Sequence, residues 1–235
     1  MRQTIKLGSV GNIRVQVHWT LLVLLAGLFV WLLAKGGSVV LAARGLILVA
    51  LLFGCVVLHE LGHGLAARYL GVRTLDVTLY PIGGIARLEH MPRNPKQELM
   101  IACAGPVVNL AIALGLLILF LYNSTSVRPG HILDGSLLVS LVWMNLALFA
   151  FNLLPAFPMD GGRVLRALLA TRLSYDAATR IAVWTGQTLA ILFGLAAIFS
   201  VPGFRGFNPV LLFIAVFVFL AAQQEGRQVL HPPAD

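Results

Sequence analysis

The chain has 235 residues, of which 59% are hydrophobic and 11% are charged, and its mean hydropathy is +0.90. Soluble domains carry about 25% charged residues, so this composition excludes an ordinary soluble protein and indicates an integral membrane protein. The formal net charge is +8, but the Lys and Arg residues fall between apolar runs and form no single basic face. We interpret them as signals of membrane orientation and as contacts with anionic lipid, and we expect no nucleic-acid partner.

The chain begins with a segment that is polar enough to lie outside the bilayer, residues 1–18. Apolar and polar residues alternate from Ile13 to Val17, which predicts an N-terminal strand or hairpin rather than a signal peptide. Residues 19–34 are the first apolar run and the first predicted transmembrane helix. His18 precedes this helix and is interpreted as a polar anchor at the interface. The alternative is that the hairpin folds inward and brings His18 to a metal site.

The rest of the chain alternates apolar runs with short polar connections. Residues 72–90 differ, because Thr74–Tyr80 and Ile85–Glu89 resemble two strands around a Gly-rich bend. We therefore predict an all-α polytopic membrane protein, a single domain over residues 1–235, with about six transmembrane helices and a small membrane-associated β-sheet. The helices expected after the first are residues 45–70, 97–122, 136–172 with a break, 177–200 and 208–223.

The most informative stretch lies in the second of these helices, at His59-Glu60-Leu61-Gly62-His63. His59 and His63 are four residues apart and share one helix face, so both imidazoles can reach one metal ion. Glu60 lies beside them, where it can hold a water. Ionisable groups are costly at membrane depth, and this cluster is therefore interpreted as a functional site.

A second unusual stretch interrupts the fourth predicted helix, from Asn152 to Gly162. Its prolines and glycines release backbone groups from helical bonding, which a membrane tolerates only beside a cavity or packed protein. Asp160 is the one carboxylate in this stretch. A catalytic zinc typically takes three protein ligands, so Asp160 is a candidate third ligand. The alternative is that Asp160 caps the helical turn that begins at Gly161.

The charges predict the orientation of the chain. With six spans, thirteen Lys and Arg residues fall on the side of the termini and four on the other side, which favours a cytoplasmic position for both termini. The second and fourth helices then run in the same direction and carry their polar stretches toward their inner ends. We therefore predict that the His pair and Asp160 meet in the cytoplasmic half of the membrane.

The third predicted helix has a face made of small residues and one Asn. Close packing against another helix explains such a face, and the alternative is a direct role near the site. The face is formed by Ala102, Ala104, Gly105 and Asn109.

At these motifs the chain resembles the site-2 protease family of intramembrane zinc metalloproteases. The resemblance rests on the His-Glu-x-x-His motif and on the pattern Asn-x-x-Pro-x-x-Pro-x-Asp-Gly, which runs here from Asn152 to Gly161. Gly83-Gly84 and the run Ala104-Gly105-Pro106 followed by Asn109 add to it. Some members of the family carry nucleotide-sensing or PDZ domains, and we expect this chain to be the minimal core without them, or a piece trimmed to that core.

The resemblance implies roles for individual residues. It implies one Zn²⁺ per chain, bound by His59, His63 and Asp160, with Glu60 as the catalytic base. It also implies that Asn152 contacts the substrate or the oxyanion. The expected activity is zinc-dependent endopeptidase hydrolysis within transmembrane segments of membrane proteins, as in regulated intramembrane proteolysis.

A helical substrate must unwind before its carbonyls can be attacked. Addition of the substrate as a strand to the edge of Thr74–Tyr80 or Ile85–Glu89 would hold it extended, and the alternative is that these strands only cover the loop between helices. The expected partners are a transmembrane protein substrate and the lipid bilayer. We expect a prokaryotic cell membrane, with both termini and the active site toward the cytoplasm.

Two other functions are open on the residues alone. A catalytically silent homologue that binds membrane proteins has no need of a base beside two metal ligands. A metal transporter would offer polar positions on several helices along a route, whereas here they gather at one depth. The protease is therefore the favoured hypothesis.

Overall fold

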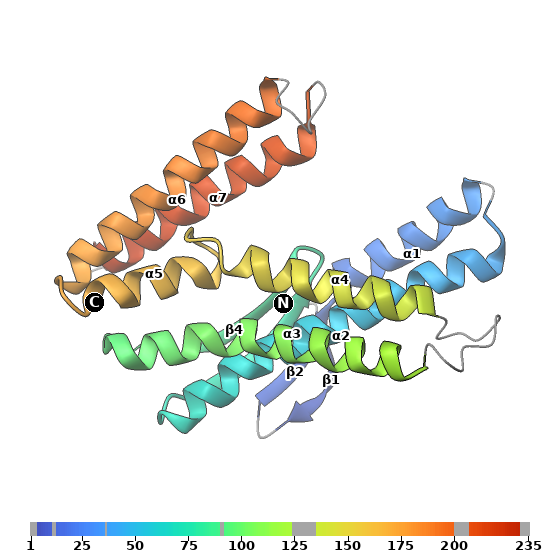
Figure 1. The fold of residues 1–235 in the computed structure, drawn as a ribbon, viewed down its shortest axis with the longest axis horizontal. Helices are drawn as coiled ribbons and strands as arrows, with labels where there is room; N and C mark the ends of the chain where they lie inside the picture. The colour runs from blue at the N-terminus through green and yellow to red at the C-terminus, as the bar shows by residue number, and fades with distance from the viewer. Residues whose placement is uncertain are drawn as a thin grey trace. The chain divides into compact units, whose positions relative to one another are not determined.

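The fold is mostly helical with one small sheet, as the computed structural model in Figure 1 shows, which confirms the predicted class. The structure describes residues 4–10, 13–35, 37–89, 92–123, 135–199 and 207–230. Within them the elements are β1 (Thr4–Val10), β2 (Ile13–His18), α1 (Trp19–Ala34), α2 (Val39–Tyr69), β3 (Thr74–Tyr80), β4 (Gly83–Leu88), α3 (Pro95–Asn123), α4 (Gly135–Asn152), α5 (Asp160–Ala170), α6 (Tyr175–Ile198) and α7 (Pro209–Leu230).

The chain folds as two compact units. The first comprises Met1–Met91 and Ala104–Phe149, and the second comprises Pro92–Cys103 and Ala150–Asp235. Helices α3 and α4 therefore contribute residues to both units. The single domain predicted over the whole chain stays a prediction.

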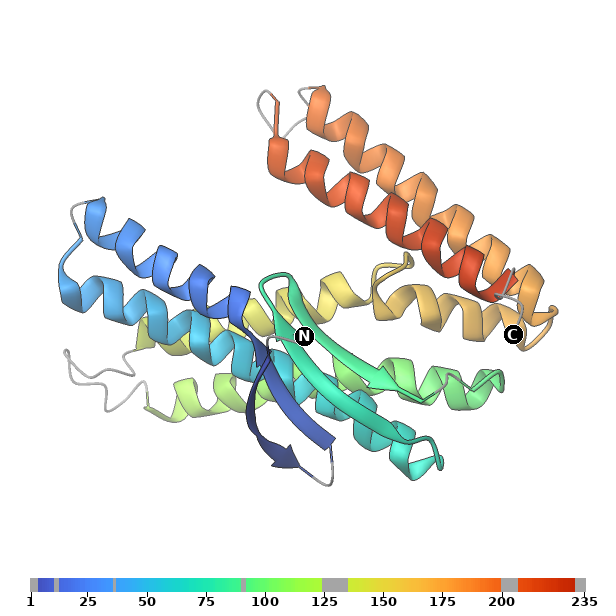
Figure 2. The ribbon, with the colours of Figure 1, turned by 180° about the vertical axis from the view of Figure 1, so that it is seen from behind.

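The sheet belongs to the first unit and has the strand order β1-β2-β3-β4, which can be followed in Figure 2. The outer pairs are antiparallel, while β2 and β3 are parallel, with Val15 opposite Val77. A parallel pair needs a long connection, and α1 and α2 supply it. Because β3 is paired on both sides, the prediction that the edge of Thr74–Tyr80 could hold a substrate is wrong. Of the two strands considered, only β4 has a free edge among the described residues.

Helix α2 packs on the sheet at the level of the His motif. Leu61 lies in a buried cluster with Ile13 of β2 and Val77 of β3. Buried apolar residues occur at every second position, at Ile13, Val15 and Val17 of β2 and at Val77 and Leu79 of β3. Within each strand these side chains therefore face the same side of the sheet. The helix begins at Val39, earlier than the predicted residue 45, because Ser38 caps it by accepting a hydrogen bond from the Leu41 N–H at 3.2 Å.

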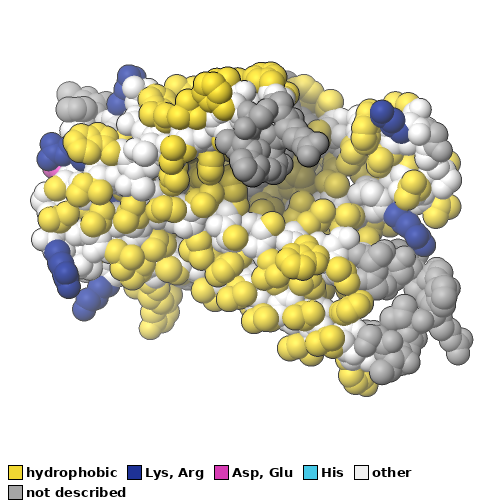
Figure 3. Space-filling view, turned by 45° about the horizontal axis from the view of Figure 1, so that its top comes forward, with side chains coloured by type: hydrophobic (Ala, Val, Ile, Leu, Met, Phe, Trp, Pro, Cys, Tyr) yellow, Lys and Arg dark blue, Asp and Glu magenta, His cyan; other side chains and the backbone are white. Residues whose placement is uncertain are grey.

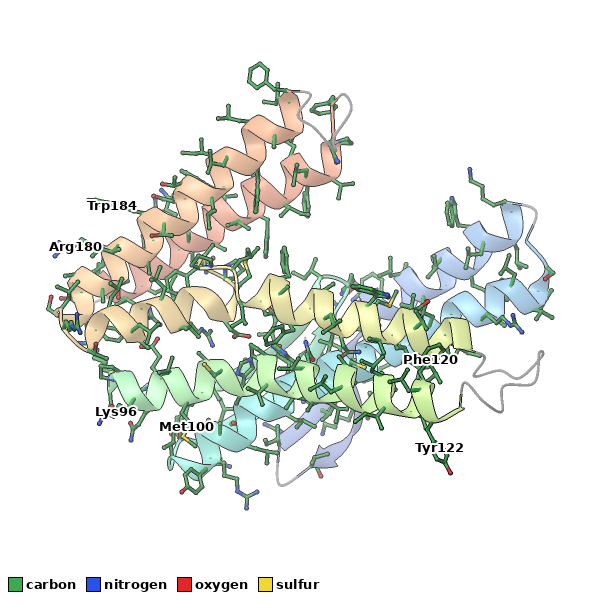
Figure 4. All side chains as sticks on the ribbon, in the orientation of Figure 1. Lys96, Met100, Phe120, Tyr122, Arg180 and Trp184 are labelled. Atoms are coloured by element: carbon green, nitrogen blue, oxygen red, sulfur yellow. The ribbon has the colours of Figure 1, made fainter. Side chains whose placement is uncertain are left out.

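Among the residues that the structure describes, four helices are long and apolar enough to cross a membrane, namely α2, α3, α6 and α7. Helix α1 and residues Leu137–Asn152 of α4 are apolar but shorter, so the count of about six spans stays a prediction. Hydrophobic side chains dominate the face drawn in Figure 3, as expected for a surface in contact with lipid. Large aromatic side chains are also exposed, including Tyr122 on α3 at 80% and Trp184 on α6 at 66%, both labelled in Figure 4.

The second unit contains the break between α4 and α5. Helices α6 and α7 lie side by side in both ribbon views, and Phe157 from the break is buried in a cluster with Ala182 and Val183 of α6 and Ala222 of α7. Burial in protein is the condition under which non-helical backbone is tolerated at membrane depth. The break is therefore held by apolar packing within its own unit.

A buried guanidinium joins the other elements of this unit. Arg166 of α5 is 1% exposed and donates to Glu98 of α3 at 2.6 and 2.8 Å and to Glu225 of α7 at 2.7 Å. Its guanidinium carbon also lies 5.0 Å from the ring centre of Phe157 and 5.1 Å from that of Tyr175. Arg166 thereby connects the segment that precedes Asp160 to the ends of three helices.

Candidate metal centre

The two motif histidines converge within the first unit. His59 and His63 are one turn apart on α2 and are 5% and 4% exposed, and their Nε2 atoms are 3.1 Å apart. Two nitrogens bound tetrahedrally to one zinc at about 2.0–2.1 Å each would be separated by roughly 3.3 Å. The imidazole pair therefore fits a zinc ion, as the spacing in the sequence predicts.

Helix α3 approaches the His pair so closely that only glycine fits. A Cβ on Gly105 would overlap His63 Nε2 and would lie 2.7 Å from His59 Cε1. On the opposite side of the contact, a Cβ on Gly62 of α2 would lie 2.9 Å from the Ala104 carbonyl oxygen and 2.8 Å from Val108. The small-residue face predicted on this helix thus serves close packing, as interpreted, and at Gly105 it also touches the rings of His59 and His63.

Glu60 is held at the edge of the sheet. Its Oε2 accepts a hydrogen bond from the Ala86 N–H of β4 at 3.1 Å, so this amide of the edge strand points out of the sheet toward the carboxylate. Gly84 gives the carboxylate room, since a Cβ there would lie 2.7 Å from Glu60 Cγ. The hydrogen bond from Ala86 and the close approach of Gly84 therefore hold the His-Glu-x-x-His motif against the β3-β4 hairpin. The sequence predicted both parts, but it gave no signal for this contact beyond the paired glycines of the hairpin.

Asp160 lies in the second unit as the first residue of α5 and is 7% exposed. The N-cap of α5 is Met159, with extended backbone and no capping hydrogen bond from its side chain. The helix therefore begins at Asp160 itself, and the alternative that Asp160 is the cap of a turn starting at Gly161 is not what the backbone shows. A carboxylate in the first turn is favoured by the helix dipole.

The two glycines after Asp160 follow from the way the break folds back. A Cβ on Gly161 would overlap the carbonyl groups of Leu153 and Leu154, and a Cβ on Gly162 would lie 2.7 Å from the Phe157 nitrogen. Any larger residue would push the start of α5 away from the loop. The Asp-Gly-Gly sequence thus fixes where the Asp160 backbone lies within its unit.

Two further predicted residues can be placed. Asn152 is the last residue of α4 and is half-buried. His18 caps α1, with its Nδ1 2.7 Å from Thr20 Oγ1, and its ring stacks on Tyr80 at 5.1 Å. These contacts give His18 a structural role at the junction of β2 and α1, and its position at a membrane interface stays a prediction.

Comparison with known proteins decides the family. The sequence profile described as Peptidase family M50 matches residues 47–133 and 126–194. This chain belongs to peptidase family M50. The solved site-2 protease from Methanocaldococcus jannaschii is 37% identical, with a TM-score of 0.66 over 95% of each chain, and the family resemblance found in the motifs is confirmed.

Curated relatives in this family carry the same kind of name. A zinc metalloprotease of Methanocaldococcus jannaschii is 37% identical over 97% of this chain and 62% of its own length. A putative zinc metalloprotease of Mycobacterium tuberculosis is 34% identical over 97% of this chain and 60% of its own length. Stage IV sporulation protein FB of Bacillus subtilis is 28% identical over 86% of this chain. The chain thus spans less than two thirds of the length of the first two.

The close contact of α3 yields a test of the centre. Gly105→Ala places a methyl group against both imidazoles, so we expect the His pair to be displaced and the zinc content of the purified protein to fall to less than half. Gly115→Ala on the same helix is the matched control, because a Cβ there meets no atom within 4 Å. The measurement is metal analysis after detergent purification. Equal zinc content in the two variants would contradict the proposed location of the metal.

Proposed function

We propose that this chain is a zinc-dependent intramembrane endopeptidase that hydrolyses peptide bonds within transmembrane segments of membrane proteins, as in regulated intramembrane proteolysis. The observation that carries the proposal is the buried His59–His63 pair, with Nε2 atoms 3.1 Å apart, on a helix apolar enough to cross a membrane. Glu60 stands beside the pair. Membership of peptidase family M50 supports the same activity.

The proposed metal ligands are His59, His63 and Asp160, and the proposed stoichiometry is one Zn²⁺ per chain. Two imidazoles and a carboxylate are a donor set that zinc accepts in hydrolases, with a position left for water or substrate. All three side chains are buried, and the names of the curated relatives specify zinc. Zinc bound there would lower the pKa of a water molecule and polarise the scissile carbonyl.

Glu60 is the proposed general base. The Ala86 N–H fixes one oxygen of its carboxylate, so the group is oriented before substrate arrives. Glu60 takes a proton from the attacking water as the water oxygen bonds to the carbonyl carbon, and it delivers the proton to the amine when the carbon–nitrogen bond breaks. The products are a new carboxylate and a new amine.

Asn152 is the proposed contact for the substrate or the oxyanion. It stands at the end of α4, where the helix gives way to the break that leads to Asp160. An amide donor directed at a developing oxyanion contributes on the order of 10²-fold or more in hydrolases. The proposal rests on the family pattern that runs from Asn152 to Gly161.

The substrate is proposed to add to the free edge of β4. The Ala86 N–H points away from β3, toward the free edge, and donates a hydrogen bond to Glu60. Amides of a strand alternate in direction, so the amide of Leu88 also faces outward, while the Glu89 N–H donates inward to the Arg73 carbonyl at 2.9 Å. A peptide extended along this edge passes beside Glu60.

The remaining proposals concern the partners of the protein, its orientation in the membrane, its location and its domain organisation. The partners are a transmembrane protein substrate and lipid, and the exposed hydrophobic side chains of the long helices support the lipid contact. The excess of Lys and Arg on the side of the termini supports a cytoplasmic position of both termini and of the site. A prokaryotic cell membrane is the proposed location, and residues 1–235 are proposed to act as one catalytic domain.

Replacement of the base tests the activity. Glu60→Gln removes the proton acceptor but keeps the size of the side chain, so we expect a loss of 10²-fold or more in kcat with zinc still bound. The measurement is cleavage of a synthetic single-span peptide in detergent micelles, followed by mass spectrometry, with metal analysis of the same preparation. Cleavage by Glu60→Gln at the wild-type rate would sink the assignment, and transport of zinc into vesicles without peptide cleavage would favour a transporter.

Replacement of an outward amide tests strand addition. Leu88→Pro removes the N–H that faces the free edge and leaves the bonds between β3 and β4, so we expect KM for the peptide to rise several-fold. Leu88→Ala is the control for loss of the side chain alone. Steady-state cleavage kinetics and the unfolding temperature are measured together; equal KM values for the two variants, with both folded, would leave the strands as a cover for the loop.

A further inference from the structure

A second asparagine lies one helical turn from the His pair. Gly105, Asn109 and Ala113 are buried at four-residue intervals along α3, and residues at this spacing share one face of a helix. Gly105 is the point at which this face touches the rings of His59 and His63. Asn109 is therefore the next side chain on the face that approaches the metal-binding imidazoles.

The direction of helical side chains brings Asn109 toward the centre. Cα–Cβ bonds tilt toward the helix N-terminus, and a side chain covers the turn that precedes its own Cα. The turn that precedes Asn109 contains Gly105, which has no side chain to occupy the space. The carboxamide of Asn109 therefore leans toward the level of the two histidine rings.

The carboxamide of Asn109 is buried and makes no hydrogen bond to the described residues. Asn109 is 0% exposed, and neither its Oδ1 nor its Nδ2 has a hydrogen-bond partner among the residues that the structure describes. Asn145 of α4 is equally buried, and its Oδ1 also has no partner among the described residues, but its Nδ2 donates to the Leu141 carbonyl at 2.9 Å and to Cys55 Sγ at 3.4 Å. A buried polar group without a partner costs stability, so it needs an explanation such as a role in catalysis.

We propose that Asn109 is a catalytic residue that binds the scissile carbonyl group of the substrate. Its Nδ2 donates a hydrogen bond to the carbonyl oxygen, and the bond strengthens as negative charge develops on that oxygen. A neutral amide is suited to this task, because it donates without adding charge beside the metal ligands. The inference deepens the proposed function and rests on it. Asn109 is a second donor beside the proposed Asn152, and the two asparagines lie on different helices, α3 and α4.

The test replaces the carboxamide by an apolar group of similar size. Asn109→Leu removes the donor, and we expect kcat for the single-span peptide to fall by about 10²-fold. We expect KM to stay within about threefold of wild type and zinc content to be unchanged. Because an unpaired buried amide is lost, the unfolding temperature should not fall.

Asn145→Leu is the matched control. It removes a buried carboxamide of the same first unit whose Nδ2 is bonded, so we expect a lower unfolding temperature with kcat per folded molecule close to wild type. A second readout needs no turnover: a phosphinic analogue of the peptide, with a tetrahedral centre at the cleavage position, should bind Asn109→Leu far more weakly than wild type. The unmodified peptide should bind both proteins alike.

The outcomes separate the two proposals. Wild-type kcat in Asn109→Leu, while Glu60→Gln is inactive, would overturn the role of Asn109 and leave the protease standing. A loss of kcat accompanied by loss of zinc, or by a fall in unfolding temperature like that of Asn145→Leu, would also overturn it, because the role would then be structural. If the wild-type protein neither cleaves the peptide nor binds the analogue, the proposed function fails and this inference fails with it.

Discussion

The contact of α3 with the His pair is the constraint on which the first unit depends. Imidazoles inside an apolar helix are stable only where they have polar partners and where lipid is kept away from them. Glycine at position 105 lets the backbone of α3 cover both rings, and glycine at position 62 lets α2 approach from the other side. A methyl group at either position would separate the helices. The face of α2 that carries the candidate metal ligands is therefore also the surface on which α3 packs.

Close approach of the backbone at glycine residues also positions the other candidate site residues, Glu60 and Asp160. Gly84 makes room for Glu60 beside β4, and the Ala86 amide then fixes the carboxylate. In the second unit, Gly161 and Gly162 let the break fold back on the start of α5. There the buried guanidinium of Arg166 connects Phe157 to Glu98 and Glu225. Removing one member of such a buried ion pair leaves an uncompensated charge, which typically costs about 3–5 kcal/mol. Asp160 is thus carried by a segment with little freedom to shift.

The helical position of the His pair, the strands and the break before Asp160 could be predicted from the sequence, because each depends on a local sequence pattern. The spacing of His59 and His63 predicts a shared helix face, alternation in residues 72–90 predicts strands, and the prolines after Asn152 predict the break. The structure differs where the signal is not local. Strand order cannot be inferred from alternation. The prediction that a substrate could add to an edge of Thr74–Tyr80 is therefore wrong, because this strand pairs with both β2 and β4. The hydrogen bond from Ala86 to Glu60 and the unused carboxamide of Asn109 depend on long-range packing, which no local pattern encodes.

The central claim is that a zinc ion held by this chain directs peptide hydrolysis inside an apolar segment. The most direct measurement incubates the detergent-purified protein with a single-span peptide, alone, with a zinc chelator, and with the chelator followed by added Zn²⁺. Mass spectrometry of the products then locates the cut. The account predicts cleavage within the apolar segment that stops with the chelator and returns with zinc. Cleavage that continues undiminished after complete removal of zinc, or cuts confined to the polar flanks of the peptide, would contradict it.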